Sequence, residues 1–193
     1  MAADSLTGGP AALALTDTSC GLPSTISPEF LLTLELLPLL RASAPARIVY
    51  VASIGQHPLD FSDLMLTRGY TGTRAYGQSK LAQIMSGFEL ASRIPAAEVT
   101  VNSLHPATYM PTKIVLAEAG SSIDTLDTGV AATYRLVSDP ALDGVTGQFF
   151  NQTHTARAHR QAYDRNARAE LWNRSLQLTG GPDIAVPEPD GHI

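Results

Sequence analysis

Two short runs of apolar and β-branched residues, separated by a long stretch with helical spacing, constrain the fold of this chain most strongly. Residues 47–53 form a short apolar, β-branched run that ends in small residues, which is typical of a buried strand, and residues 98–104 predict a second strand that Pro106 closes. Between them, residues 73–93 repeat apolar side chains at intervals of three and four, which predicts a helix. This order of elements predicts an α/β fold with a parallel sheet.

A further helix is expected to begin near Ser27. The Ser27 hydroxyl can cap free backbone N–H groups, Pro28 suits the first helical position, and Glu29 favours the positive end of the helix dipole. Helices are also expected at residues 125–137 and 164–178, and a short strand at 148–150.

Three segments differ in composition. Residues 1–24 are rich in small and polar residues, so we expect a loosely structured segment with at most one turn of helix near residues 11–15. Residues 25–179 are expected to form the domain, and the Pro- and Gly-rich residues 180–193 a flexible tail.

The overall composition excludes several classes of protein. Thirteen Lys and Arg against eighteen Asp and Glu give a net charge of −5, which disfavours nucleic acid as a partner. The most apolar run, residues 30–40, is shorter than the ~20 residues of a membrane span. No signal peptide is recognisable, Cys20 is the single cysteine, and the histidine spacing indicates no metal site. We therefore expect a cytoplasmic protein.

Tyr76 and Lys80 are the first candidates for chemistry. Four residues apart on the expected helix, they share one face with their Cβ atoms about 5–6 Å apart. A neighbouring ammonium favours the phenolate, so we expect the pKa of Tyr76 to fall from its ordinary value of about 10. Such a phenol can exchange a proton with a substrate oxygen. The alternative is that Tyr76 packs and Lys80 is solvated.

Ser53 is the third candidate, because it ends a strand at the edge where parallel α/β sheets bind ligands. Its hydroxyl can donate a hydrogen bond to a substrate oxygen. A hydrolase using Ser53 and Lys80 is an alternative, although Val51 stands where the Gly-x-Ser-x-Gly motif needs glycine. Residues 104–112 follow the next strand, so their backbone and the hydroxyls of Thr108 and Thr112 are candidates for contacts with a cofactor.

Taken in order, these motifs resemble the short-chain dehydrogenase/reductase family, most closely its retinol-dehydrogenase-like branch. The resemblance rests on three motifs and a C-terminal segment, namely Val51-Ala52-Ser53, Tyr76-Gly77-Gln78-Ser79-Lys80, Val101-Asn102-Ser103-Leu104-His105-Pro106, and residues 162–180. It implies a partial Rossmann-like, doubly wound parallel sheet with flanking helices. It covers roughly residues 27–180, and the ordered set is more specific than any single motif.

The resemblance implies hydride transfer between NAD or NADP and a small carbonyl or alcohol substrate. Tyr76 would be the general acid/base, Lys80 would lower its pKa and hold the nicotinamide ribose, and Ser53 would orient the substrate oxygen. Tyr76, Lys80, Pro106, Thr108 and Thr112 would contact the cofactor. The family often pairs the helix that carries Tyr76 between subunits, which implies a homo-oligomer.

One departure from the family affects the expected activity. Residues 7–14 are the only candidate for the Gly-rich turn that binds the cofactor pyrophosphate, and they lack the glycine spacing. We therefore expect a family member without the N-terminal dinucleotide-binding half. The alternative to an active enzyme is a catalytically silent relative that acts only through protein association.

Overall fold

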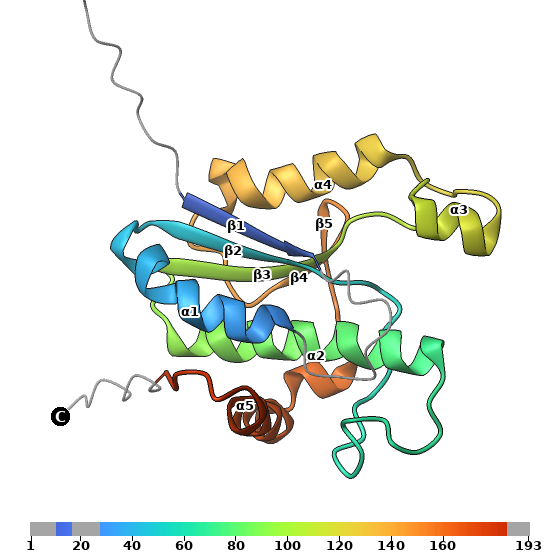
Figure 1. Cartoon of the computed structure of the whole chain (residues 1–193). Coiled ribbons are helices and arrows are strands. Elements are labelled where there is room, and N and C mark those ends of the chain that lie inside the picture. The colour runs from blue at the N-terminus through green and yellow to red at the C-terminus, as the bar shows by residue number, and fades with distance from the viewer. Residues whose placement is uncertain (1–10, 17–27, 185–193) are drawn as a thin grey trace, which may run out of the picture.

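The described residues form a five-stranded sheet that helices cover on both faces (Figure 1). The computed structural model describes residues 11–16 and 28–184. The strands follow the sheet order β1-β2-β3-β4-β5, and their bounds are β1 (Ala11–Thr16), β2 (Ala46–Val51), β3 (Val99–His105), β4 (Phe149–Asn151) and β5 (His154–Ala156). The first four strands are parallel and β5 is antiparallel to β4. The prediction of an α/β fold with a parallel sheet is confirmed.

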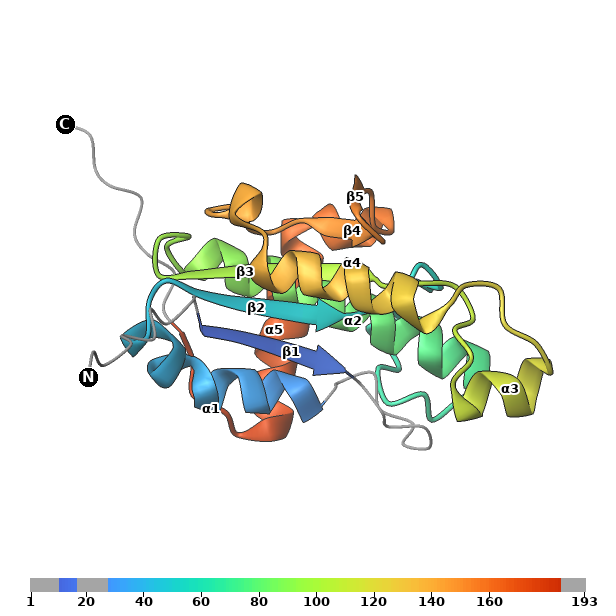
Figure 2. The same ribbon diagram turned by 90° about the horizontal axis from the view of Figure 1, so that it is seen from above.

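The helices form two groups on opposite faces of the sheet. The α-helices are α1 (Pro28–Ala42), α2 (Gly72–Arg93), α3 (Lys113–Ala119), α4 (Leu126–Ser138) and α5 (Arg165–Thr179), and the 3-10 helices are η1 (Pro140–Leu142) and η2 (Arg160–Tyr163). Helices α1, α2 and α5 lie below the sheet in Figure 1, whereas α4 lies above it and α3 extends beyond its edge. Figure 2, which views the molecule from above, shows α4 lying over the sheet.

Alternation along β2 explains why both faces of the sheet are covered. Ile48 and Tyr50 join the core cluster that α1, α2 and α5 share, whereas Val49 joins the cluster under α4. Successive side chains of a strand point to opposite faces, so an apolar run without polar interruptions needs a layer of helices on each side. All three side chains are at most 2% exposed.

Helix α5 forms a second layer over α1 and α2 (Figure 1). Trp172 of α5 packs edge-on against Phe30 of α1, with ring centres 5.0 Å apart. Leu171 joins the cluster built around the α2 residues Ile84 and Met85. The Asp164 side chain caps the N-terminus of α5.

Two expectations about the ends of the chain need correction. A strand, β1, lies where a helical turn was expected within residues 1–24, and it pairs with β2 along its whole length. The remainder of that segment lies outside the described residues. The tail beginning at residue 180 is docked in its first part, because Arg93 donates to the carbonyl of Ile184 at 2.7 Å and Ile184 packs against the core. The sequence analysis also missed α3 and β5.

Candidate functional site

The register between β2 and β3 brings two of the candidate segments to one edge of the sheet. Val51 pairs with Leu104 in the parallel ladder, and the Ala52 N–H donates to the Leu104 carbonyl at 2.8 Å. Ser53 and Pro106 each come two residues after this pair, so both lie at the carboxyl edge of the sheet. Ligands bind at this edge in open α/β sheets.

Helix α2 brings Tyr76 and Lys80 to the same place. The Thr71 side chain caps the helix by accepting from the Arg74 N–H, which leaves Tyr76 in the second turn. The Lys80 ammonium lies 5.7 Å from the centre of the Tyr76 ring and donates to the Val51 carbonyl at 3.4 Å. Lys80 is 6% exposed and Tyr76 is 51% exposed. The cation is therefore held inside the protein, while the phenol is open to a ligand.

Gly55 shows how closely Ser53 and Tyr76 approach each other. A β-carbon added at Gly55 would lie 3.5 Å from Ser53 Oγ and 3.6 Å from Tyr76 Cε1. The Gly55 N–H donates to Ser53 Oγ at 3.0 Å, so Oγ acts as an acceptor there and its hydrogen can still point to a ligand. The three predicted catalytic side chains thus meet at one edge of the sheet.

The loop of residues 106–112, which we call the β3–α3 loop, is anchored by hydrogen bonds within the protein. Thr108 Oγ1 lies 3.1 Å from His105 Nε2, and the Thr108 N–H donates to Asp124 at 2.6 Å. Thr112 caps α3, since its hydroxyl accepts from the Val115 N–H. Each of these two hydroxyls thus has a partner within the protein and keeps the capacity for a further hydrogen bond, and Pro106 is buried at the edge.

His105 lies beneath this loop, largely buried. Burial lowers the pKa of its imidazole, and the carboxylate of Asp124 opposes that effect. A neutral imidazole has one nitrogen that accepts and one that donates, so His105 Nε2 can accept from the Thr108 hydroxyl. The position of Thr108 in a motif does not by itself reveal its hydrogen bond with His105.

His57 is a neighbour of the site that the sequence analysis missed. The backbone N–H of His57 donates to the Gly77 carbonyl at 3.0 Å, and a β-carbon at Gly77 would lie only 2.7 Å from His57 Cγ. Gly77 therefore lets the imidazole pack directly on α2, beside Tyr76. The sequence signal was weak, because a lone histidine in a polar loop is common at protein surfaces that bind nothing.

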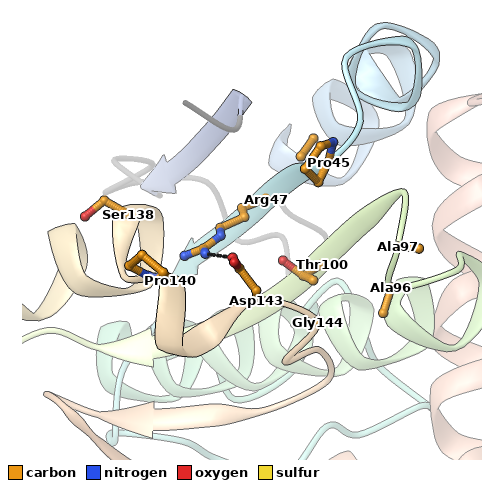
Figure 3. A pocket seen from close by; sticks show the side chains of 10 residues that line it. Pro45, Arg47, Ala96, Ala97, Thr100, Ser138, Pro140, Asp143 and Gly144 are labelled. Carbon is orange, nitrogen blue, oxygen red and sulfur yellow. Dashed lines mark hydrogen bonds and ion pairs between the residues drawn. The ribbon is translucent and has the colours of Figure 1, made fainter. Parts of the chain in front are cut away.

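A cavity of about 470 Å³ lies at the opposite, amino edge of the strands (Figure 3). Arg47 is buried beside it and pairs with Asp143. The same guanidinium donates to the carbonyls of Leu136 and Asp139, so it holds the C-terminal end of α4 against β2. The Arg47 guanidinium therefore has a structural role. The cavity is remote from Ser53, Tyr76 and Lys80.

Among the described residues, no helix is long and apolar enough to cross a bilayer. Nor do the described parts of the chain bring three His, Cys, Asp or Glu side chains together in an arrangement suited to a metal ion. The expected cytoplasmic location stays a prediction.

Comparison with known proteins finds relatives among the retinol dehydrogenases. No protein-family model matches the chain. Retinol dehydrogenase 14 from Homo sapiens is 33% identical over 172 residues, which cover 79% of this chain and 49% of that protein. Retinol dehydrogenase 13 from Homo sapiens is also 33% identical, over 79% of this chain and 51% of its own length. The chain is homologous to these retinol dehydrogenases over about half of their length.

Solved structures share the fold of this chain. An uncharacterized protein from Mycobacterium paratuberculosis superposes with a TM-score of 0.57 at 26% identity, over 82% of this chain and 57% of its own. A protein from Pseudomonas syringae assigned as a short chain dehydrogenase shares the fold, with a TM-score of 0.53 at 23% identity over 76% and 63% of the two chains. The chain thus shares its fold with these two proteins and spans about half the length of the curated relatives it matches.

Proposed function

We propose that this chain carries the catalytic site of a nicotinamide-dependent oxidoreductase that interconverts a small carbonyl and an alcohol. The observation that carries the proposal is the convergence of Ser53 and Tyr76 around Gly55, with the Lys80 ammonium 5.7 Å from the Tyr76 ring centre. The names of the retinol dehydrogenases support the same class of reaction. The cytoplasm is the proposed location.

Each of the three side chains has a distinct role in this proposal. Tyr76 gives a proton to the substrate oxygen when a carbonyl is reduced and takes it back when an alcohol is oxidised. Lys80 holds its buried ammonium 5.7 Å from the centre of the Tyr76 ring, beside the reacting phenol. Ser53 donates a hydrogen bond to the same oxygen while negative charge develops on it.

The donor set suits the nicotinamide end of NAD or NADP, since an ammonium, a phenol and a hydroxyl meet at the edge where such cofactors bind. The bound cofactor supplies or accepts the hydride. We assign Tyr76 and Lys80 to the ribose. Pro106 would form a wall of the pocket. Thr108 and Thr112 would contact the cofactor through their backbone and hydroxyls, which keep hydrogen-bonding capacity beside their contacts with His105 and α3.

The first test is titration of the purified chain with NADH and NADPH, followed by nicotinamide fluorescence. Saturable binding is expected, with reduction of small carbonyl compounds. Tyr76→Phe should lower kcat by about 10²–10⁴-fold, the usual loss of a general acid. Tyr70→Phe is the control, because Tyr70 is similarly exposed at 49% and we assign it no role.

Two results would contradict the proposal. No saturable binding of either dinucleotide up to millimolar concentration would favour a silent relative that acts by protein association. Labelling of Ser53 by a fluorophosphonate, lost in Lys80→Met, would instead indicate a Ser–Lys hydrolase.

A further inference from the structure

We propose that Asp124 is a positioning residue that latches the β3–α3 loop in the shape required for cofactor binding. The inference rests on the proposed function, because it assigns a role to a residue outside the catalytic set. Asp124 lies in the segment between α3 and α4, sixteen residues after Thr108 in the sequence. Sequence motifs alone do not connect the two residues.

One carboxylate oxygen of Asp124 makes the latch. Its Oδ2 accepts from the Thr108 N–H at 2.6 Å and from Gln152 Nε2 at 3.0 Å. The Asp124 N–H also donates back to the Thr108 carbonyl at 3.0 Å. Hydrogen bonds to a charged acceptor are stronger than neutral ones, so Asp124 fixes the loop more firmly than a backbone contact alone.

Gln152 extends the latch to the sheet. It lies in the turn between β4 and β5, and its N–H donates to the His105 carbonyl at 2.7 Å. Asp124 therefore joins three segments at the carboxyl edge, namely the end of β3, the segment before α4 and the β4–β5 turn. The loop beside Ser53 is thus held from the side opposite to α2.

The backbone of the loop shows that it is held in a costly shape. Tyr109 has a φ of 44°, in the left-handed region that non-glycine residues rarely adopt. Such a conformation persists only where its surroundings enforce it. The Tyr109 carbonyl accepts from the Ile123 N–H at 3.0 Å, directly beside Asp124. The loop would therefore relax to other conformations once the latch is removed.

Two substitutions separate the hydrogen bonds of Asp124 from its charge. Asp124→Asn keeps an acceptor oxygen that can serve both Thr108 and Gln152, whereas Asp124→Ala removes both bonds. Asp127→Ala is the matched control, because Asp127 is exposed in the first turn of α4. Circular dichroism at rising temperature would show that each variant is folded.

Proteolysis measures the latch without any cofactor. Lysine occurs only at Lys80, which is buried, and at Lys113, which is exposed at the start of α3. A lysine-specific protease should therefore cut the folded protein at Lys113. We expect cleavage of Asp124→Ala to be about tenfold faster than that of the wild type, because local opening controls access. Asp124→Asn and Asp127→Ala should stay within about twofold.

Cofactor binding measures the positioning role. In Asp124→Ala, the KM for the preferred dinucleotide should rise about tenfold while kcat changes less than threefold, as expected when ground-state and transition-state binding are lost equally. In Asp124→Asn, both KM and kcat should equal the wild-type values.

Unchanged cleavage in Asp124→Ala would overturn the latch. Faster cleavage with an unchanged KM would overturn the positioning role. A wild type that binds no dinucleotide would refute the proposed function and with it the positioning role, whereas the cleavage rates would still decide the latch.

Discussion

The phenol of Tyr50 lies fully inside the protein, on the face of β2 that α1 covers. Burial raises its pKa well above the ordinary value; its hydrogen bond to Thr33 at 2.9 Å acts in the opposite direction, and the carboxylate of Glu29 adds a smaller increase. The folded protein therefore keeps this proton in alkaline solution, while an unfolded chain loses it near pH ~10. Folding and proton binding at Tyr50 are thus linked.

We predict that Tyr50 makes the protein less stable as pH rises above about 10, where the unfolded state binds fewer protons than the folded state. Tyr50→Phe should lose about 0.5–1.5 kcal/mol at pH 7, the usual value of one hydrogen bond, but show a shallower decline above pH 10. Urea unfolding at a series of pH values would test this. Tyr134→Phe, at an exposed position, should follow the wild type, and equal slopes in Tyr50→Phe would contradict the linkage.

At the residue scale, the sequence predicts that Ser53, Tyr76 and Lys80 lie close together, but it does not predict the contacts within the β3–α3 loop. Tyr76 and Lys80 share a face because helical spacing is a local property, and Ser53 reaches them because it ends a buried strand. The partners of Thr108 depend on contacts with His105 and the distant Asp124, which no local pattern encodes. The roles of all these residues stay predictions until they are measured.

At the scale of elements, buried charges fix α5 to α2. Glu89 of α2 accepts from Arg93 at 3.0 Å and from Arg168 of α5 at 3.3 Å, and all three side chains are at most 12% exposed. Removing one partner of a buried ion pair leaves the other charge uncompensated. The contact between the two helices therefore depends strongly on Glu89.

Glu89→Ala should lower the free energy of unfolding by about 3–5 kcal/mol, the usual cost of breaking a buried pair. Glu170→Ala is the control, because Glu170 pairs with Arg174 on the surface of α5 and both side chains are more than 40% exposed. That change should cost about 0.5 kcal/mol or less. Urea unfolding followed by circular dichroism would measure both, and similar losses would contradict the argument.

Strand β1 shows where reading of elements from the sequence failed. Residues 11–16 are mostly small, so neither a strand nor a helix period stands out. Their strand conformation comes from a parallel ladder with β2, in which Leu13 pairs with Ile48 and Thr16 with Val51. Backbone pairing of this kind depends on a distant partner, whereas the longer elements carried their own hydrophobic pattern.

At the scale of the whole molecule, α5 also affects the predicted homo-oligomer. From Gly77 to Leu90 of α2, every residue except Ser79 and Ser86 is buried. The sheet covers one side of this stretch, and α5 packs against another. Pairing of α2 between two copies would require α5 to move. Oligomerisation through this helix stays a prediction, and light scattering over a range of concentrations would test it.

The docked residues after α5 should contribute to global stability. Asp183 accepts from Trp172 Nε1 at 3.3 Å and lies 3.6 Å from the Arg93 guanidinium. A chain ending at Ile184 should therefore be more stable than one ending at Gly180, by about 1.5–3 kcal/mol for hydrogen bonds to charged groups. Thermal unfolding of the two truncated proteins would measure the difference. Equal stability would mean that residues 181–184 contribute nothing to the fold.

The position of Trp172 gives the protein a built-in optical reporter. It is the single tryptophan of the chain, 1% exposed, with the Phe30 ring at its edge and the Arg93 guanidinium 4.5 Å from its ring centre. Indole emission moves to longer wavelength when water reaches the ring, and a nearby cation alters its intensity. Tryptophan fluorescence would therefore follow the packing of α5 against α1 and α2, in real time and without any added dye.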